Sequence, residues 1–153
     1  MIFFPSKMPK SVFEKEETKR YGNILEVLMS WERIQPNKHL YAFVESSPEG
    51  SFTSSIIEEL GVSITKKLSY KMVLTQVKLV AYQLLYVWKI KPGERVLLCF
   101  PPGNDFLIGF LGCLWAGVIA VPVPAPRPNK LEIDLAKFCY ITKDCTASAV
   151  LTT

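Results

Sequence analysis

Apolar residues recur along the chain at helical spacing in two early segments. The spacing predicts a helix that starts at Asn23 and ends before Pro36, and a longer amphipathic helix that starts at Ser69. Pro92 and Gly93 supply the turn that ends the longer helix. The face of this helix that we expect to be buried consists of Val73, Val77, Val80, Ala81, Leu84, Leu85 and Trp88.

Segments typical of strands alternate with these helices. Residues 39–46, HLYAFVES, are rich in aromatic and β-branched residues, and residues 63–68 are expected to pair back on them as an antiparallel hairpin. Between them, residues 46–61 are predicted to form a surface loop with a short helical turn at 55–60. Residues 95–100, RVLLCF, form a run that is continuously apolar after Arg95, which indicates a strand covered on both faces.

No charged residue lies between Asp105 and Arg127, which allows two interpretations. On length alone, a helix over 106–126 could cross a bilayer, because about 20 apolar residues suffice. The alternative is a buried helix, capped by Asn104 or Asp105 and ending at Gly117, followed by a strand and a Pro-rich loop. The second interpretation is favoured, since each proline inside a helix costs about 3 kcal/mol and this stretch has three.

The last segments continue the alternation of helices and strands. Residues 131–145 carry Leu131, Leu135, Phe138 and Ile141 at helical spacing, and residues 147–153 again resemble a strand. This order predicts an α/β fold, a layered sheet with flanking helices. Residues 1–22 are charge-dense and are interpreted as a polar leader to a domain that occupies 23–153.

Composition narrows the functional classes. The chain has 153 residues, of which 49% are hydrophobic, enough for one ordinary core. A net charge of +4, spread along the chain, gives little support for a nucleic-acid or membrane partner. The four cysteines lie near apolar segments at spacings that do not suit zinc, and are expected to be small buried hydrophobes: Cys99, Cys113, Cys139 and Cys145. With no secretory signal recognised, the expected compartment is the cytoplasm.

Two motifs carry a resemblance to a known family. Leu68, Ser69 and Tyr70 resemble the first core motif of the adenylate-forming (acyl-activating) enzymes, and residues 114–117, LWAG, followed by AVPVP, resemble the second. The stretch PPGNDFLIGFLGCLWAG with its Pro-rich continuation is most similar to long-chain fatty acyl-AMP ligases. The resemblance covers about 23–153 and implies a partial N-terminal subdomain of the large domain of such an enzyme.

The resemblance implies a function for the complete enzyme. It would activate a fatty acid with ATP and Mg²⁺ to an acyl adenylate and transfer the acyl group to an acyl carrier protein. The family's phosphate loop and its catalytic lysine find no counterpart in this chain. We therefore expect an N-terminal fragment that is inactive alone and that binds no cofactor by itself.

No catalytic, cofactor-binding or metal-binding residue is predicted. His39 lacks a matched nucleophile and acid, and Glu132 and Asp134 have the spacing of ordinary surface charges of a helix. Arg127 is expected to be a solvated loop charge, although it could also face the nucleotide or a partner. Phe106, just after the PPGN turn, is the one candidate for an acyl pocket, because fatty chains require an apolar channel.

Two other functional classes remain open. The chain could be a non-catalytic module that binds a partner, or half of a split ligase that pairs with the missing C-terminal part. A less favoured alternative is a small membrane protein that spans the bilayer at 106–126.

Overall fold

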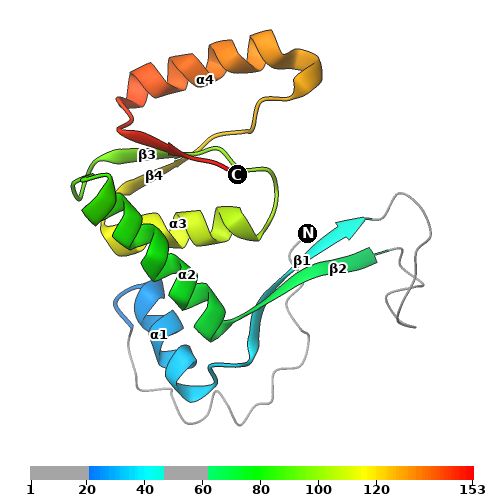
Figure 1. Cartoon of the computed structure of the whole chain (residues 1–153), viewed down its shortest axis with the longest axis vertical. Coiled ribbons are helices and arrows are strands. Elements are labelled where there is room, and N and C mark those ends of the chain that lie inside the picture. Colours follow the sequence, from blue (N-terminus) through cyan, green and yellow to red (C-terminus); the bar gives the residue numbers. More distant parts are fainter. Residues whose placement is uncertain (1–20, 47–61) are drawn as a thin grey trace.

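Parallel strands form a central sheet, and helices cover both of its faces (Figure 1). The computed structural model describes residues 21–46 and 62–153. In the sheet the order is β4-β3-β5, and both pairs are parallel. Its strands are β3 (Arg95–Leu98), β4 (Ile119–Pro122) and β5 (Ala149–Leu151). The predicted α/β fold with flanking helices is confirmed.

The helices divide into two layers. Figure 1 shows α4 on one side of the sheet and α2 with α3 on the other. The bounds are α1 (Ile24–Ile34), α2 (Tyr70–Tyr82), η3 (Gln83–Val87), α3 (Asn104–Ala116), η4 (Pro128–Lys130) and α4 (Leu131–Cys145). α2 continues directly into η3, which is a single π-helical turn.

A separate antiparallel hairpin precedes the sheet. It consists of β1 (His39–Ser46) and β2 (Val62–Ser69), as the sequence predicts. The helix expected before it is also confirmed: the Asn23 side chain caps α1 by accepting a hydrogen bond from the backbone N–H of Glu26 at 3.0 Å. The predicted loop over 46–61 falls almost wholly outside the described residues.

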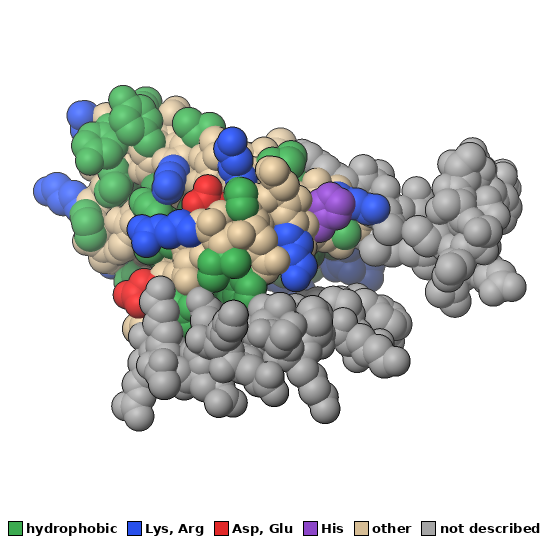
Figure 2. Space-filling model, turned by 90° about the horizontal axis from the view of Figure 1, so that it is seen from below, with side chains coloured by type: hydrophobic (Ala, Val, Ile, Leu, Met, Phe, Trp, Pro, Cys, Tyr) green, Lys and Arg blue, Asp and Glu red, His purple; other side chains and the backbone are tan. Residues whose placement is uncertain are grey.

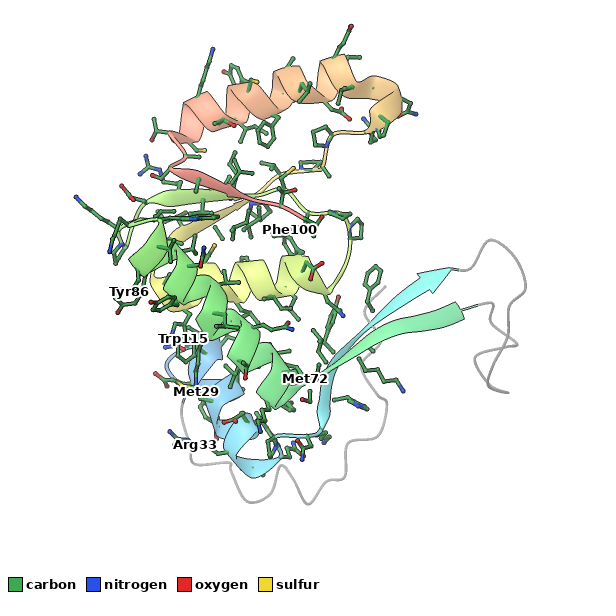
Figure 3. The ribbon with its side chains drawn as sticks, viewed as in Figure 1. Met29, Arg33, Met72, Tyr86, Phe100 and Trp115 are labelled. Atoms are coloured by element: carbon green, nitrogen blue, oxygen red, sulfur yellow. The ribbon has the colours of Figure 1, made fainter. Side chains whose placement is uncertain are left out.

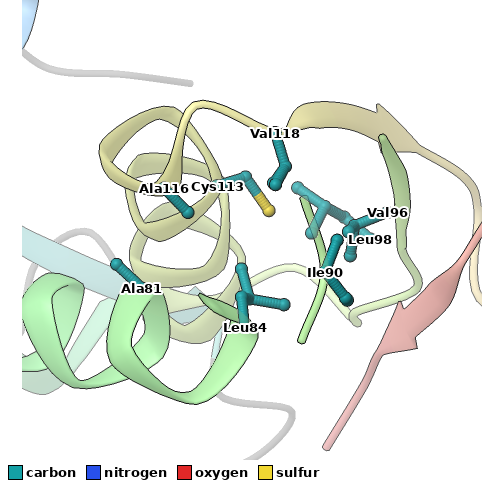
Figure 4. Close-up of a cluster of buried hydrophobic side chains, with 8 residues drawn as sticks. All are labelled: Ala81, Leu84, Ile90, Val96, Leu98, Cys113, Ala116 and Val118. Atoms are coloured by element: carbon teal, nitrogen blue, oxygen red, sulfur yellow. The ribbon is translucent and has the colours of Figure 1, made fainter. Parts of the chain in front are cut away.

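Alternate residues of β3 enter two different cores. Val96 and Leu98 pack with residues of α2, η3 and α3 (Figure 4), while Leu97 packs toward α4. All three side chains have no exposed surface. The expectation that this strand is covered on both faces is therefore confirmed, and the strand joins the two layers.

The uncharged stretch after Asp105 forms a helix and a strand. α3 ends at Ala116, and Gly117 follows in the left-handed conformation at φ 70°, which glycine adopts at no steric cost. β4 then begins at Ile119. No helix in the described part of the chain has the length and apolar character to cross a bilayer. A single helix over 106–126 is therefore not what this sequence forms.

Two predicted details of the helices are wrong. The residue that caps α3 is Gly103, not Asn104 or Asp105, because the chain enters the helix one residue earlier. Asn104 is the first helical residue and is buried, and Asp105 lies in the first turn, where a carboxylate favours the helix dipole. Trp88 was expected on the buried face of α2 but is 44% exposed, because the π turn of η3 changes the rotation of the chain after Tyr82.

Candidate functional site

The carboxyl ends of β3 and β4 form the edge of the sheet where a ligand is expected. β3 leads into α3 on one face, whereas β4 leads through η4 into α4 on the opposite face. In open α/β sheets, ligands bind outside the carboxyl ends of neighbouring strands whose connections leave on opposite sides. We call residues 99–106 and 123–127 the carboxyl edge.

Phe106 lies at this edge, as its position in the sequence predicts. It belongs to the first turn of α3, it is 37% exposed, and its ring stacks on Phe110 with 6.2 Å between ring centroids. Phe100 follows β3 (Figure 3) and packs against the cluster of buried residues between the sheet and α2 and α3. The edge is therefore apolar and aromatic on the α3 side.

The Pro-rich loop after β4 is fixed to α4 by an ion pair. The Arg127 side chain donates from Nε to Asp134 Oδ2 at 2.9 Å and from Nη2 to Oδ1 at 3.1 Å. The backbone N–H of Arg127 donates to the same carboxylate at 3.1 Å. Such a two-pronged pair has defined geometry as well as charge. The loop that borders the carboxyl edge therefore has a fixed attachment.

These contacts change the predicted roles of both residues. Asp134 is not an ordinary surface charge: its side chain is 13% exposed, and hydrogen bonds from Arg127 lower its pKa to about 2. Arg127 is exposed at its side chain, as expected of a loop charge, but it is held by Asp134 and not simply solvated. Arg127 and Asp134 are seven residues apart with η4 between them, and no single helix or strand includes both residues, so a regular spacing could not predict the pair. Glu132 is exposed, as predicted.

The cysteines differ in exposure more than the sequence suggests. Cys99 and Cys113 are buried, and burial raises the pKa of the Cys113 thiol to about 11. Cys145 is half-buried, but Cys139 is exposed on α4, so the expectation of four buried cysteines is wrong there. A protonated buried thiol is a poor nucleophile. Neither buried cysteine therefore suits covalent catalysis.

The remaining polar candidates give no reactive constellation. His39 is exposed and is the first residue of β1, which belongs to the hairpin and not to the sheet that forms the carboxyl edge. Across residues 21–46 and 62–153, no group of three or more His, Cys, Asp or Glu side chains could hold a metal ion. The carboxyl edge thus offers apolar contact and a fixed loop. Its residues, 99–106 and 123–127, include no histidine and one carboxylate, Asp105, so they do not form a pair for general acid–base catalysis.

Comparison with known protein families shows which family this chain belongs to. The model of the AMP-binding enzyme family matches residues 54–153. The chain belongs to the AMP-binding enzyme family. The predicted resemblance to adenylate-forming enzymes is confirmed.

Relatives within the family are fatty acyl-AMP ligases among others. A medium-chain-fatty-acid–[acyl-carrier-protein] ligase, JamA, of Moorena producens is 28% identical over 132 residues, which are 86% of this chain and 20% of that protein. The Disco-interacting protein 2 homolog B-A of Danio rerio is 41% identical over 64 residues, 42% of this chain and 4% of that protein.

A solved structure has the same fold. The fatty acyl-adenylate ligase of Legionella pneumophila, solved in complex with acyl adenylate and pyrophosphate, superposes with a TM-score of 0.67 at 28% identity. The match covers 87% of this chain and 20% of that one. The chain thus spans about a fifth of the length of these ligases.

The two family motifs have structural roles in this chain. Ser69 caps α2, because its hydroxyl accepts a hydrogen bond from the backbone N–H of Met72 at 3.3 Å, and Leu68 is fully buried. Tyr70 stacks on Trp31 of α1 with ring centroids 6.4 Å apart. The second motif ends α3 at Gly117. Both motifs therefore position helices around the sheet.

Proposed function

We propose that this chain is the N-terminal part of the acyl-activating domain of a fatty acyl-AMP ligase. The observation that carries the proposal is the superposition on the L. pneumophila ligase, whose structure contains acyl adenylate and pyrophosphate. Residues 23–153 form the partial subdomain, and residues 1–22 precede it as a polar leader. The site of action is the cytoplasm.

The reaction of the complete enzyme has two steps. A carboxylate oxygen of the fatty acid attacks the α-phosphorus of ATP, and the bond to the bridging oxygen breaks, so pyrophosphate leaves with that electron pair. The thiol of an acyl carrier protein then loses its proton and attacks the acyl carbonyl, and AMP leaves. The name of JamA describes ligation to a carrier protein. Mg²⁺ would neutralise the phosphate charge in the first step.

The described residues supply structure for this reaction rather than reacting groups. The carboxyl edge is apolar on the α3 side, where Phe106 is 37% exposed and Phe110 supports its ring. We assign Phe106 to the wall of the acyl channel, because a fatty chain binds in dry apolar surroundings. The Arg127–Asp134 pair holds the neighbouring loop in place. No step is assigned to a side chain of this chain.

ATP–pyrophosphate exchange tests the proposal in two arms. The isolated 153-residue chain is expected to show no exchange with fatty acids of 8 to 18 carbons. A chimera is expected to exchange: residues 23–153 replace the matching N-terminal segment of the L. pneumophila ligase. Exchange by the isolated chain would contradict its structural role. A folded chimera that exchanges with no fatty acid would contradict the functional assignment.

Phe106 gives a sharper readout in the same chimera. Phe106→Trp should shift the preference toward shorter fatty acids and Phe106→Ala toward longer ones, because the volume of the channel wall changes. Tyr140→Ala, at an aromatic side chain that is 75% exposed in the C-terminal half of α4, is the matched control. An unchanged chain-length profile in both Phe106 variants would remove Phe106 from the channel.

A second candidate function is favoured by one comparison. The match to the Danio rerio protein has the higher identity, 41%, although over only 64 residues, and the name of that protein describes an interaction and not a reaction. A non-catalytic partner-binding module is therefore the alternative. Exchange by the chimera would favour the ligase, while a folded and inactive chimera would favour the binding module.

A further inference from the structure

Four large side chains are exposed between residues 82 and 88, where α2 and η3 end. Tyr82 and Tyr86 are 57% and 61% exposed, with their ring centroids 5.1 Å apart. Figure 3 shows Tyr86 on the outer side of this helical segment, pointing away from the sheet. Val87 and Trp88 follow at 52% and 44% exposed. We call these four residues the aromatic tip.

The π turn of η3 creates the aromatic tip. The backbone N–H of Trp88 donates to the carbonyl of Gln83 at 2.9 Å, five residues back, where an α-helix would use the residue four back. As a result Leu84 stays fully buried while Trp88, one α-helical turn later in the sequence, is exposed. Single π turns inside helices occur frequently at functional sites.

Two lysines adjoin the aromatic tip, and the segment that leads to it contains no acidic residue. Residues 62–91 contain six lysines, at positions 66, 67, 71, 78, 89 and 91, and no Asp or Glu. Lys89 and Lys91 adjoin the tip and are exposed. The next acid, Glu94, accepts a hydrogen bond from the backbone N–H of Lys91 at 2.8 Å. Basic side chains also prevail over acidic ones on the face that Figure 2 shows.

The chemistry of the aromatic tip fits a lipid surface. Tyrosine and tryptophan concentrate at membrane–water interfaces, where their rings lie at the level of the headgroups. Lysines beside such rings extend toward anionic headgroups and attract them. Protein interfaces, by contrast, are depleted in lysine. We propose that the aromatic tip, with Lys89 and Lys91, docks this chain on the surface of an anionic phospholipid bilayer.

This docking differs from a membrane span and does not depend on the proposed function. The dispersed charge of the sequence gave little support for a lipid partner, but exposed Lys89 and Lys91 directly follow the exposed aromatic rings at the end of α2 and η3. The contact would be peripheral, because the apolar face of α2 is buried in the core and only the exposed rings and lysines can reach the headgroups. The test of this docking measures binding to vesicles, and its result does not depend on whether the chain is part of a ligase.

Vesicle flotation tests the proposal with the full 153-residue chain. The probes are vesicles of phosphatidylcholine alone and of phosphatidylcholine with 30% phosphatidylglycerol, about a third anionic. We expect binding to the anionic vesicles and a weakening of about tenfold or more in Y86S/V87S/W88S. K89E/K91E should lose about thirtyfold or more on anionic vesicles, because each lysine near the surface contributes about 1 kcal/mol and the substitution reverses both charges.

Matched exposed residues on α4 provide the controls. Tyr140 is 75% exposed, and Tyr140→Ser together with Lys137→Glu and Lys143→Glu should leave binding unchanged. Circular dichroism confirms that each variant is folded. Equal binding by the tip variants and the wild type would overturn the proposal, as would equal binding to neutral and anionic vesicles. Tip-dependent binding to an acidic carrier protein without binding to vesicles would replace the lipid by a protein partner.

Discussion

The two faces of the central sheet are covered in very different ways. Toward α2 and α3, the cluster around Val96 and Leu98 contains eight buried residues. Toward α4, the cluster around Leu97 contains three. α3 itself has seven buried residues and α4 has none. Since β3 is equally buried on both faces, the difference lies in the helices and not in the strand.

The sequences of the helices explain the difference. α3 has one charged residue, Asp105, and lies between the sheet and α2, so apolar residues are favourable all round it. α4 has five charged residues and contacts the sheet through one stripe that includes Phe138 and Ile141. A thick, two-helix layer therefore opposes a thin, one-helix layer. The predictions below test whether this difference governs stability.

The largest effect is expected from two neighbouring leucines of β3. Leu97 and Leu98 have no exposed surface and face opposite layers. Leu98→Ala should lower the free energy of unfolding by about 4–5 kcal/mol and Leu97→Ala by about 2–3 kcal/mol, because α4 can move into the space and α3 cannot. Urea unfolding measures both. Equal losses would show that the two layers are equally rigid.

The next effect concerns the contact between α2 and α3. A Cβ added at Gly112 would lie 2.5 Å from Val80 Cγ1, so Gly112→Ala should destabilise the chain by about 1–3 kcal/mol. Without this contact, alanine in a helix would stabilise it by up to about 1 kcal/mol, so the sign of the change is decisive. Gly103→Ala, with no heavy atom nearer than 3.9 Å to the added Cβ, is the control, and its cost should stay below about 1 kcal/mol.

A smaller effect concerns the attachment of the thin layer. Hydrogen bonds from Arg127 lower the pKa of Asp134 from 3.8 to about 2. The folded state therefore binds this proton less readily than the unfolded state, and the stability that the pair contributes is present above about pH 4 and lost toward pH 2. Asp134→Asn should remove this part of the acid dependence in urea unfolding between pH 5 and 2. An unchanged profile would mean that the ion pair does not hold the loop.

The last prediction concerns the reactivity of the cysteine thiols in the two layers, and it involves no change in stability. Cys139 of α4 is exposed and should react first with iodoacetamide under native conditions, while Cys113 of α3 should be protected. Burial raises the pKa of Cys113 to about 11, which keeps its thiol protonated at neutral pH. Mass spectrometry of the labelled peptides gives the order. Early labelling of Cys113 would contradict a closed α2–α3 layer.

Most elements could be predicted from local patterns, because each has a clear period and a clear end. Asn23, Ser69 and Gly117 mark helix boundaries by capping chemistry, and the structure confirms all three. Trp88 was misplaced because a π turn depends on how the end of α2 meets β3, which helical spacing does not encode. The cap of α3 was misplaced by one residue, which is the usual uncertainty of helix ends.

The candidate site could be predicted only in part. Phe106 lies at the carboxyl edge, as the strand–turn–helix order around it implies. Its role in an acyl channel stays a prediction, because this chain matches only about a fifth of the ligases. The opposite wall of the channel would come from the remaining part of such an enzyme. The Arg127–Asp134 pair was missed because it joins a loop to a helix across η4. Such contacts depend on the turn between the two residues and not on a repeating pattern.

The kinetics of the chimera test the central claim most directly. If residues 23–153 provide the scaffold and the channel wall but no reacting group, the chimera should keep the kcat of the L. pneumophila ligase for ATP–pyrophosphate exchange within about threefold. Its changes should be confined to the KM for the fatty acid. A folded chimera whose kcat falls a hundredfold or more at an unchanged KM would contradict the account, because the replaced segment would then contribute to the transition state.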